Sequence, residues 1–422
     1  MYVAPSLTTG VSYNSNIFLN TEELNPEADN VFTVQPALQL TVPFSNSKFR
    51  FTDTLTWVDY QKTPQAAGKT SNDALAELSL RFGSLDKLDL SARHIGGVAE
   101  TLAFDPGGEV TFDGNAYRLH SEGIAASREV SGARGYRIGL ERNVLSFDQA
   151  TDVFFFNFRG FDAEAAYLQP LSSNTRLAFG YLGSRYDHYD LGAADPNAVF
   201  RTESGDVAYA QIEGQFGIKQ PYELRVGWEE LGFSGPNDVG ADFSGLIGEG
   251  RLSTVIGGGT VFSLNGQRQP YRSFFWPNNF YLYDLVAGRV DRSFPRGSAV
   301  GGSLTLATSR YPQPSPLPCP YQEEALEYGV FNRETYLCED SHPPPDPPDP
   351  NDPPDPNPYV PVDPGSLKRH DRSILLEGYV NLVIRDHVIF RLSVVKNRKY
   401  SNFPGADYNA TVVFGGFVLG WI

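Results

Sequence analysis

Apolar and polar positions alternate with a period of two along most of this chain, and helical spacing of apolar residues is hard to find. In Leu78–Phe82, Leu88–Arg93 and Tyr222–Trp228 the apolar side chains stand two positions apart, with Gly, polar or charged residues between them. Successive side chains of a β-strand point to opposite faces, so this pattern predicts strands with one apolar and one polar face. We count eighteen such segments, near residues 5–13, 31–44, 49–62, 74–83, 88–100, 116–130, 135–148, 155–169, 175–189, 207–217, 221–234, 243–256, 260–275, 281–294, 298–313, 371–384, 388–403 and 410–422.

The links between these segments tend to alternate between short and long. The short ones are residues 45–48, 84–87, 131–134, 170–174, 218–220, 257–259, 295–297 and 385–387, and most contain turn-forming Gly, Pro, Ser or Asn. The other links are mostly longer, as in residues 14–30, 101–115 and 314–370, although 276–280 and 404–409 barely exceed the turns. Short turns at one side and long loops at the other are typical of outer-membrane barrels, whose short turns are periplasmic.

The final stretch, Ala410–Ile422, reads ATVVFGGFVLGWI and is apolar throughout. We expect it to pair with the strand near Ser6–Tyr13, because a sheet in lipid can leave no open edge. No apolar run approaches the roughly 18 residues of a transmembrane helix. The predicted fold class is therefore all-β. It is a single 18-stranded antiparallel transmembrane β-barrel over residues 1–422, located in the bacterial outer membrane with both termini periplasmic and long extracellular loops.

The two faces of the predicted strands differ in chemistry. The face that includes Leu78, Leu224 and Leu376 is expected to contact lipid, and charged residues on the opposite face are expected to line the lumen. The predicted lumen-lining residues are Glu77, Arg81, Asp89, Arg93, Arg118, Glu122, Arg137, Glu141, Glu223, Arg225, Glu249, Arg251, Glu377 and Arg391. Because Arg alternates with Asp and Glu, we expect ion pairs and no strong charge preference of the pore. These charges either only keep the lumen hydrated or line a path for a neutral or weakly charged solute such as a sugar.

Aromatic residues gather near the predicted loop-side ends of the strands. They fit a girdle at the membrane interface, where amphipathic rings are favoured. The residues concerned are Trp57, Tyr60, Tyr186, Tyr189, Phe274, Phe275, Trp276, Phe280 and Tyr281.

One predicted loop, residues 314–370 between the fifteenth and sixteenth strands, differs from the others. It contains eleven acidic and three basic residues, and twelve of the twenty-two residues in Pro343–Pro364 are proline. That composition favours an extended, acidic extracellular segment over a strand or helix. The loop also holds both cysteines of the chain, Cys319 and Cys338, for which we predict a disulfide in an exported protein. It is either a stapled surface loop, a cap over the pore mouth or a docking arm.

Composition and motifs exclude several functions. The formal net charge is −16, with no basic patch for phosphates, so we expect no nucleic-acid partner. The chain lacks G-x-S-x-G, H-E-x-x-H, Walker and G-x-G-x-x-G sequences. The arrangement nearest to a catalytic one, Asp187–Asp190, has no positioned nucleophile beside it. We therefore predict a protein that is not an enzyme and needs no cofactor.

The segment Leu7–Phe18 reads LTTGVSYNSNIF and carries a G-V-x-Y-[DN]-x-N-[IV]-[FY] opening. It resembles the outer-membrane β-barrel porin family found with exopolysaccharide secretion loci. The resemblance implies a barrel that passes polysaccharide, or otherwise serves as a porin, with a periplasmic or inner-membrane assembly behind it. It implies no particular pore residue in this chain.

We predict an outer-membrane channel for passive passage of a hydrophilic substrate, with secreted polysaccharide as the leading candidate. The expected partners are outer-membrane lipid and lipopolysaccharide, a polysaccharide substrate and periplasmic export proteins. Two alternatives stay open: a general or substrate-selective diffusion porin, and a barrel that only anchors the 314–370 loop for adhesion or docking.

Overall fold

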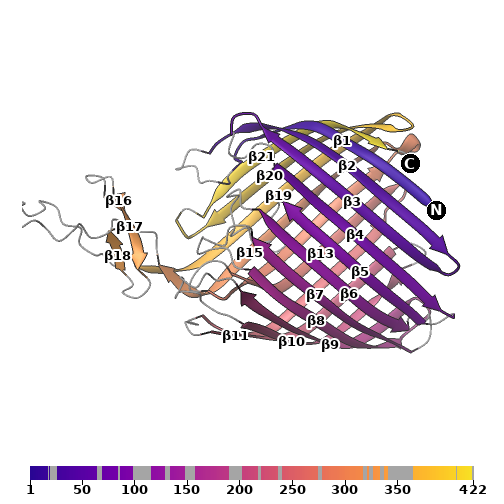
Figure 1. Cartoon of the computed structure of the whole chain (residues 1–422), viewed down its shortest axis with the longest axis horizontal. Helices are drawn as coiled ribbons and strands as arrows, with labels where there is room; N and C mark the ends of the chain where they lie inside the picture. Colours follow the sequence, from indigo (N-terminus) through magenta and orange to yellow (C-terminus); the bar gives the residue numbers. More distant parts are fainter. Residues whose placement is uncertain are drawn as a thin grey trace, which may run out of the picture.

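The computed structural model forms one antiparallel sheet of eighteen strands that closes on itself, which confirms the predicted fold class (Figure 1). Pairing of the first strand with the last leaves the sheet without an edge. The structure describes residues 1–17, 19, 26–63, 69–83, 86–97, 116–128, 134–147, 157–189, 202–216, 220–235, 240–273, 278–316, 321–322, 327–332, 337–340, 365–404 and 406–420.

The barrel strands follow the alternating segments of the sequence closely. Each pairs with its neighbours along the chain, and β15 pairs with β19 across the long insertion. The strands are β1 (Tyr2–Asn14), β2 (Asp29–Phe44), β3 (Ser47–Tyr60), β4 (Lys69–Phe82), β5 (Asp86–Gly97), β6 (Tyr117–Arg128), β7 (Gly135–Phe147), β8 (Asn157–Pro170), β9 (Thr175–Tyr189), β10 (Thr202–Phe216), β11 (Gln220–Ser234), β12 (Phe243–Val255), β13 (Thr260–Arg272), β14 (Phe280–Ser293), β15 (Ala299–Pro316), β19 (Ser366–Arg385), β20 (Val388–Ser401) and β21 (Tyr408–Gly420).

The two ends of the barrel differ in the length of their connections. At one end the links are tight, as between β2 and β3, and one of them contains the 3-10 turn η4 (Pro295–Gly297). Both termini lie at this turn end, and the longer connections lie at the other (Figure 1). The described ranges hold no helix with the length and apolarity that a membrane crossing needs.

The last strand closes the barrel on the first, as predicted. The β1–β21 pairing runs from Ser6 opposite Gly420 to Asn14 opposite Val412. At its centre Gly10 faces Gly416, and the Phe414 ring covers the pair. A Cβ added to Gly416 would lie 2.4 Å from the Thr9 carbonyl oxygen, so the closing strands approach where glycine leaves room.

Side-chain contacts identify the inner face of the wall. The Arg137 guanidinium of β7 lies 3.5 Å from Glu213 of β10, and Arg225 of β11 lies 3.8 Å from Glu164 of β8. Each pair spans three strand positions, and side chains that far apart around a barrel can meet only on its concave side. On the opposite face, exposed apolar side chains stand side by side, as with Trp228 and Leu246. The outer face is therefore the apolar one that a lipid bilayer requires.

The insertion between β15 and β19 is not simply a loop. It contains a small three-stranded antiparallel sheet of β16 (Tyr321–Gln322), β17 (Glu327–Asn332) and β18 (Leu337–Asp340), drawn away from the barrel at its loop end (Figure 1). The sequence did not predict these strands, because they are too short to show a period of two. The barrel strands also extend beyond the predicted limits, leaving residues 317–365 as the connection.

The predicted disulfide lies outside the described residues, because the placement of Cys319 and the side chain of Cys338 are not described. It stays a prediction with a direct test. Thiol titration of the unfolded, non-reduced chain is expected to find no free cysteine, because two cysteines in one exported segment oxidise to a disulfide. Reduction should then release two thiols per chain. Two thiols before reduction would show that the bridge does not form.

Candidate functional site

The structure places twelve of the fourteen predicted charged residues on the inner face. They alternate with outward apolar residues and stand beside other inward side chains, as Arg225 does between Gln211 and Glu249. The twelve are Glu77, Arg81, Asp89, Arg93, Arg137, Glu141, Glu223, Arg225, Glu249, Arg251, Glu377 and Arg391.

Arg118 and Glu122 correct the prediction, because the pairing of β6 places them on the outer face. They share their side of the strand with Ile124, which faces the apolar Leu90 and Leu140. Glu122 pairs with Arg142 at 3.3 Å, and both side chains are more than 60% exposed. The polar side of β6 was taken for the lumen side. The inner side of β6 carries mostly small or apolar residues, such as Leu119, which packs against the cluster of Tyr117 and Leu145 inside the barrel.

On the inner face of β7–β12, ion pairs hold the arginines against some of the carboxylates. Glu213 accepts hydrogen bonds from Arg137 and Arg176, and from the Gln211 amide at 2.6 Å. Arg225 donates to Gln211 at 2.8 Å and lies 3.6 Å from Glu249. These contacts order the wall, but inward carboxylates outnumber inward guanidinium groups on these strands, so this side of the lumen keeps a net negative charge.

Towards the loop end, this side of the barrel is filled by side chains. The Arg272 guanidinium at the end of β13 donates to Glu203 of β10 and lies 4.3 Å from the ring centroid of Phe158 on β8 and 4.1 Å from that of Tyr186 on β9. Because β8 and β13 are five strand positions apart, the lumen is bridged here. Phe158 and Tyr186 also belong to a buried cluster with Tyr117, Leu145 and Phe147.

The prediction of an aromatic girdle is wrong for three of its residues. Tyr186, Phe280 and Tyr281 are buried inside the barrel, where they belong to apolar clusters. Trp57 is exposed on the outer face beside Val34, in agreement with a place at the interface. Phe274, Phe275 and Trp276 lie outside the described residues, as does the side chain of Tyr189.

A second inward cluster lies at the loop end of β19 and β20. The Asp371 carboxylate accepts hydrogen bonds from Arg369 at 2.7 Å and Ser401 at 2.6 Å, and lies 3.0 Å from Lys399. The three charged side chains are at most 4% exposed. The Arg369 guanidinium also lies over the Tyr311 ring of β15, 4.9 Å from its centroid. This cluster therefore joins β15 and β19, the two strands that the 317–365 connection links, to β20.

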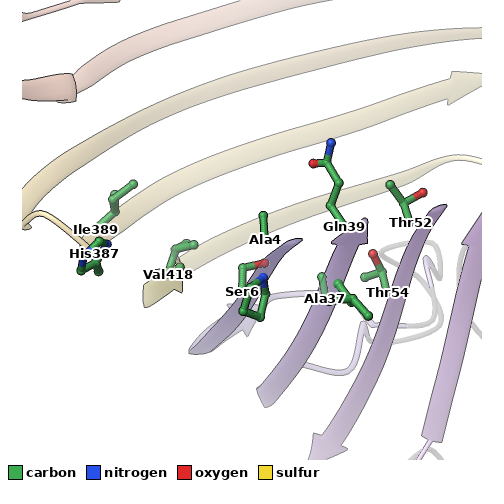
Figure 2. Close-up of a pocket in the computed structure, with 12 residues that line it drawn as sticks. Ala4, Ser6, Ala37, Gln39, Thr52, Thr54, His387, Ile389 and Val418 are labelled. Atoms are coloured by element: carbon green, nitrogen blue, oxygen red, sulfur yellow. The ribbon is translucent and has the colours of Figure 1, made fainter. Parts of the chain in front are cut away.

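On the opposite side of the lumen, β1 and β21 form an uncharged wall, which is flanked by Arg50 of β3 and Arg391 of β20. The inner faces of β1 and β21 carry no Asp, Glu, Lys or Arg in the strands that the structure describes. Near the turn end a pocket of about 310 Å³ lies between β1–β3 and β20–β21 (Figure 2). Its polar lining comes from Ser6, Gln39, Thr52, Thr54 and His387, beside small apolar residues such as Ala37. Hydroxyl and amide groups can both donate and accept hydrogen bonds, so the lining suits a neutral hydroxyl-bearing solute.

The segment Asp187–Asp190, whose sequence is nearest to a catalytic arrangement, does not bring its side chains together in the structure. Asp187 points to the outer face, 3.9 Å from Arg185, whereas His188 is buried on the inner face. Within the described ranges no group of three His, Cys, Asp or Glu residues is arranged to hold a metal ion.

A closed wall, an apolar outer face and a polar, partly packed interior define the chain as a transmembrane β-barrel of the outer-membrane type. The chain is similar to OpdK of Pseudomonas aeruginosa, crystallised with vanillate, at a TM-score of 0.45 and 11% identity over 99% of both chains. It is also similar to OccK2 (OpdF) of the same organism, crystallised with glucuronate, at a TM-score of 0.48 and 8% identity over 100% of this chain and 98% of that one.

A BenF-like porin from Pseudomonas fluorescens Pf-5 has a TM-score of 0.47 and 10% identity over 99% of each chain. Identities this low say nothing about which solute this chain passes. No family model and no curated protein sequence matches the chain. The resemblance of Leu7–Phe18 to a family associated with exopolysaccharide secretion therefore stays a prediction.

Proposed function

We propose that the barrel is an outer-membrane channel through which a small hydrophilic solute diffuses along the uncharged wall. The observation that carries the proposal is the separation of chemistry inside the barrel. Charged and aromatic side chains pack against one another between β7 and β13, whereas β1 and β21 present only uncharged residues to the lumen. The pocket in Figure 2, which lies against this uncharged wall, has a volume of about 310 Å³ and so matches a small molecule in size. The diffusion-porin alternative therefore fits better than polysaccharide export.

The lining of this path favours a neutral, hydroxyl-bearing solute. Ser6, Gln39 and Thr52 offer hydrogen bonds that replace those the solute makes with water. Ala37 and Val418 offer apolar contacts for the faces of a sugar or an aromatic ring. None of the described residues that line the pocket is Asp, Glu, Lys or Arg, so an ion entering it would lose hydration without meeting a permanent opposite charge, which is unfavourable. Short turns of outer-membrane barrels are periplasmic, so this proposal places the turn end and both termini in the periplasm and the loop end outside the cell.

Narrowing the uncharged wall should reduce conductance. Ala37 points into the pocket, whereas its neighbour Leu38 is exposed on the outer face. Ala37→Trp is expected to lower single-channel conductance in planar bilayers by roughly twofold or more, because an indole fills part of the path. Leu38→Trp is the matched control and should leave conductance unchanged, since the added ring lies in lipid.

The outcomes separate the candidate functions. Conductance that a neutral disaccharide blocks more strongly than a sugar acid of the same size supports the proposal. Equal loss of conductance in both tryptophan variants would contradict the assigned path. A complete lack of conductance, with or without deletion of residues 317–365, would leave only the anchoring role. Block that strengthens steadily with oligosaccharide length would favour polysaccharide passage.

A further inference from the structure

Basic residues from four strands gather on the outer wall at the loop end of the barrel. The pairing places them on the face of the exposed Leu306 and Leu376, outside the lumen. This group, called the basic patch below, consists of Arg268 of β13, Arg310 of β15, Arg372 of β19, and Lys396 and Arg398 of β20. Asp284 of β14 is the acidic residue among them. The patch therefore carries a net positive charge on a chain whose net charge is −16.

The charges of the basic patch are only partly compensated. Asp284 accepts hydrogen bonds from Arg268 at 3.0 Å and from Arg310. Arg372 and Arg398 are exposed, and among the described residues neither has a carboxylate within ion-pair distance. The Arg398 guanidinium lies instead over the Tyr400 ring, 4.5 Å from its centroid. At least two guanidinium groups thus present their donors to the surroundings of the barrel.

Other outward arginines are paired differently. Arg142 lies 3.3 Å from Glu122 on the neighbouring strand, and Arg185 lies 3.9 Å from Asp187. Each of these two has a carboxylate within ion-pair distance, which neither Arg372 nor Arg398 has among the described residues. The exposed guanidinium groups of Arg372 and Arg398 therefore differ from those of Arg142 and Arg185 in their pairing.

A groove of about 1000 Å³ adjoins the basic patch and runs towards the middle of the wall. Its outer floor includes Val286, Leu306 and Ile374, and Gly266 leaves space because it has no side chain. Arg372 and Tyr400 line its upper part. An apolar floor beneath a cationic rim matches a molecule with acyl chains below an anionic headgroup.

We propose that the basic patch and this groove bind one lipopolysaccharide molecule, with a sugar phosphate at Arg310, Arg372 and Arg398 and an acyl chain along Val286, Leu306 and Ile374. The planar guanidinium favours phosphate because it can donate two parallel hydrogen bonds to its oxygens. Lipopolysaccharide is the occupant because the patch lies at the loop end, which the proposed orientation places in the outer leaflet. The inference rests on that orientation and is independent of the solute that the lumen passes.

The test measures binding of diphosphoryl lipid A to the folded, full-length barrel in detergent by native mass spectrometry. The test variant combines Arg310→Gln, Arg372→Gln and Arg398→Gln. The matched control combines Arg142→Gln, Arg159→Gln and Arg185→Gln, which removes three outward arginines from β7–β9. Each arginine near an anionic lipid surface contributes about 1 kcal/mol, so the test variant should bind on the order of 100-fold more weakly and the control should bind like the unmodified protein.

Three further ligands identify the source of the phosphate. Lipid A without phosphates should bind the unmodified barrel as weakly as diphosphoryl lipid A binds the test variant. Phosphatidylglycerol and inorganic phosphate should compete poorly, because neither matches both the rim and the groove.

Unchanged binding by the test variant, equal loss in the control, or equal binding of dephosphorylated lipid A would overturn the proposal. Equally tight binding of phosphatidylglycerol would assign the site to phospholipid instead, and effective competition by inorganic phosphate would show a simple anion site. Conductance of the test variant should be unchanged, so this result stands apart from the proposed channel.

Discussion

Asp371→Leu is expected to destabilise the barrel by about 3–5 kcal/mol, because it leaves Arg369 and Lys399 buried without their shared carboxylate. Both cations lie within 3.0 Å of Asp371, and all three side chains are at most 4% exposed. Water cannot replace the lost partner at that degree of burial. The measurement is the free energy of unfolding in urea, with the barrel folded into lipid vesicles.

Two comparisons isolate the cause of this loss. Asp73→Leu removes a carboxylate from an inward ion pair with Arg93, at 2.8 Å, whose side chains are nearly half exposed. It should cost less than about 1 kcal/mol, because water solvates the remaining guanidinium. A triple variant with Arg369→Met, Asp371→Leu and Lys399→Met should recover most of the stability lost in Asp371→Leu, since no buried charge is left unpaired. If that triple variant were as unstable as the single one, lost packing and not charge would explain the effect.

Leu224→Arg and Leu376→Arg are each expected to cost roughly 2–4 kcal/mol when the residue lies near the bilayer midplane. Both leucines are exposed on the outer face, where an arginine would have to enter hydrocarbon or reach for the interface. The same unfolding measurement in lipid vesicles reports the cost, and folding yield into vesicles should fall with it.

Gln215→Arg is the control for these two variants. Gln215 is on the inner face of β10, on the same side of the strand as Glu213, and is exposed to the lumen side of the wall. An arginine there is hydrated, so stability should change by less than about 1 kcal/mol. Equal damage at Gln215 and Leu224 would show that the assignment of the two faces is wrong.

Strand positions and faces were largely predictable from the sequence, because each barrel strand alternates between lipid and a polar interior. β11 is a clear case: Leu224, Val226 and Trp228 face outward, with Glu223 and Arg225 between them facing inward. The prediction failed at β6, where the outer row becomes polar near the loop end while the inner row stays small or apolar. Alternation within one strand does not tell which of its two faces is the inner one. The face of Arg118 and Glu122 therefore follows only from the pairing of β6 with the strands beside it.

The interior of the barrel was harder to predict than its wall. Arg272 and Phe158 meet across five strand positions, and no pattern within either strand indicates that contact. The same holds for Arg369 and Tyr311, which are joined only once β15 and β19 lie side by side. The uncharged wall was implicit in the sequences of β1 and β21. Its contrast with the opposite side of the lumen depends on the fold, which gathers charged residues into ion pairs on β7–β12.

The pairing of β1 with β21 has a consequence for the order in which the barrel can assemble. Ser6 faces Gly420, so the contact that completes the sheet joins residues from opposite ends of the described chain. Closing so long a segment carries a large entropy cost, and contacts of this kind form late. Until it forms, two strand edges with unpaired backbone groups remain exposed. A chain cut before Gly415 would keep both edges open however well its other strands pair, so completion of the barrel depends on synthesis having reached its last strand.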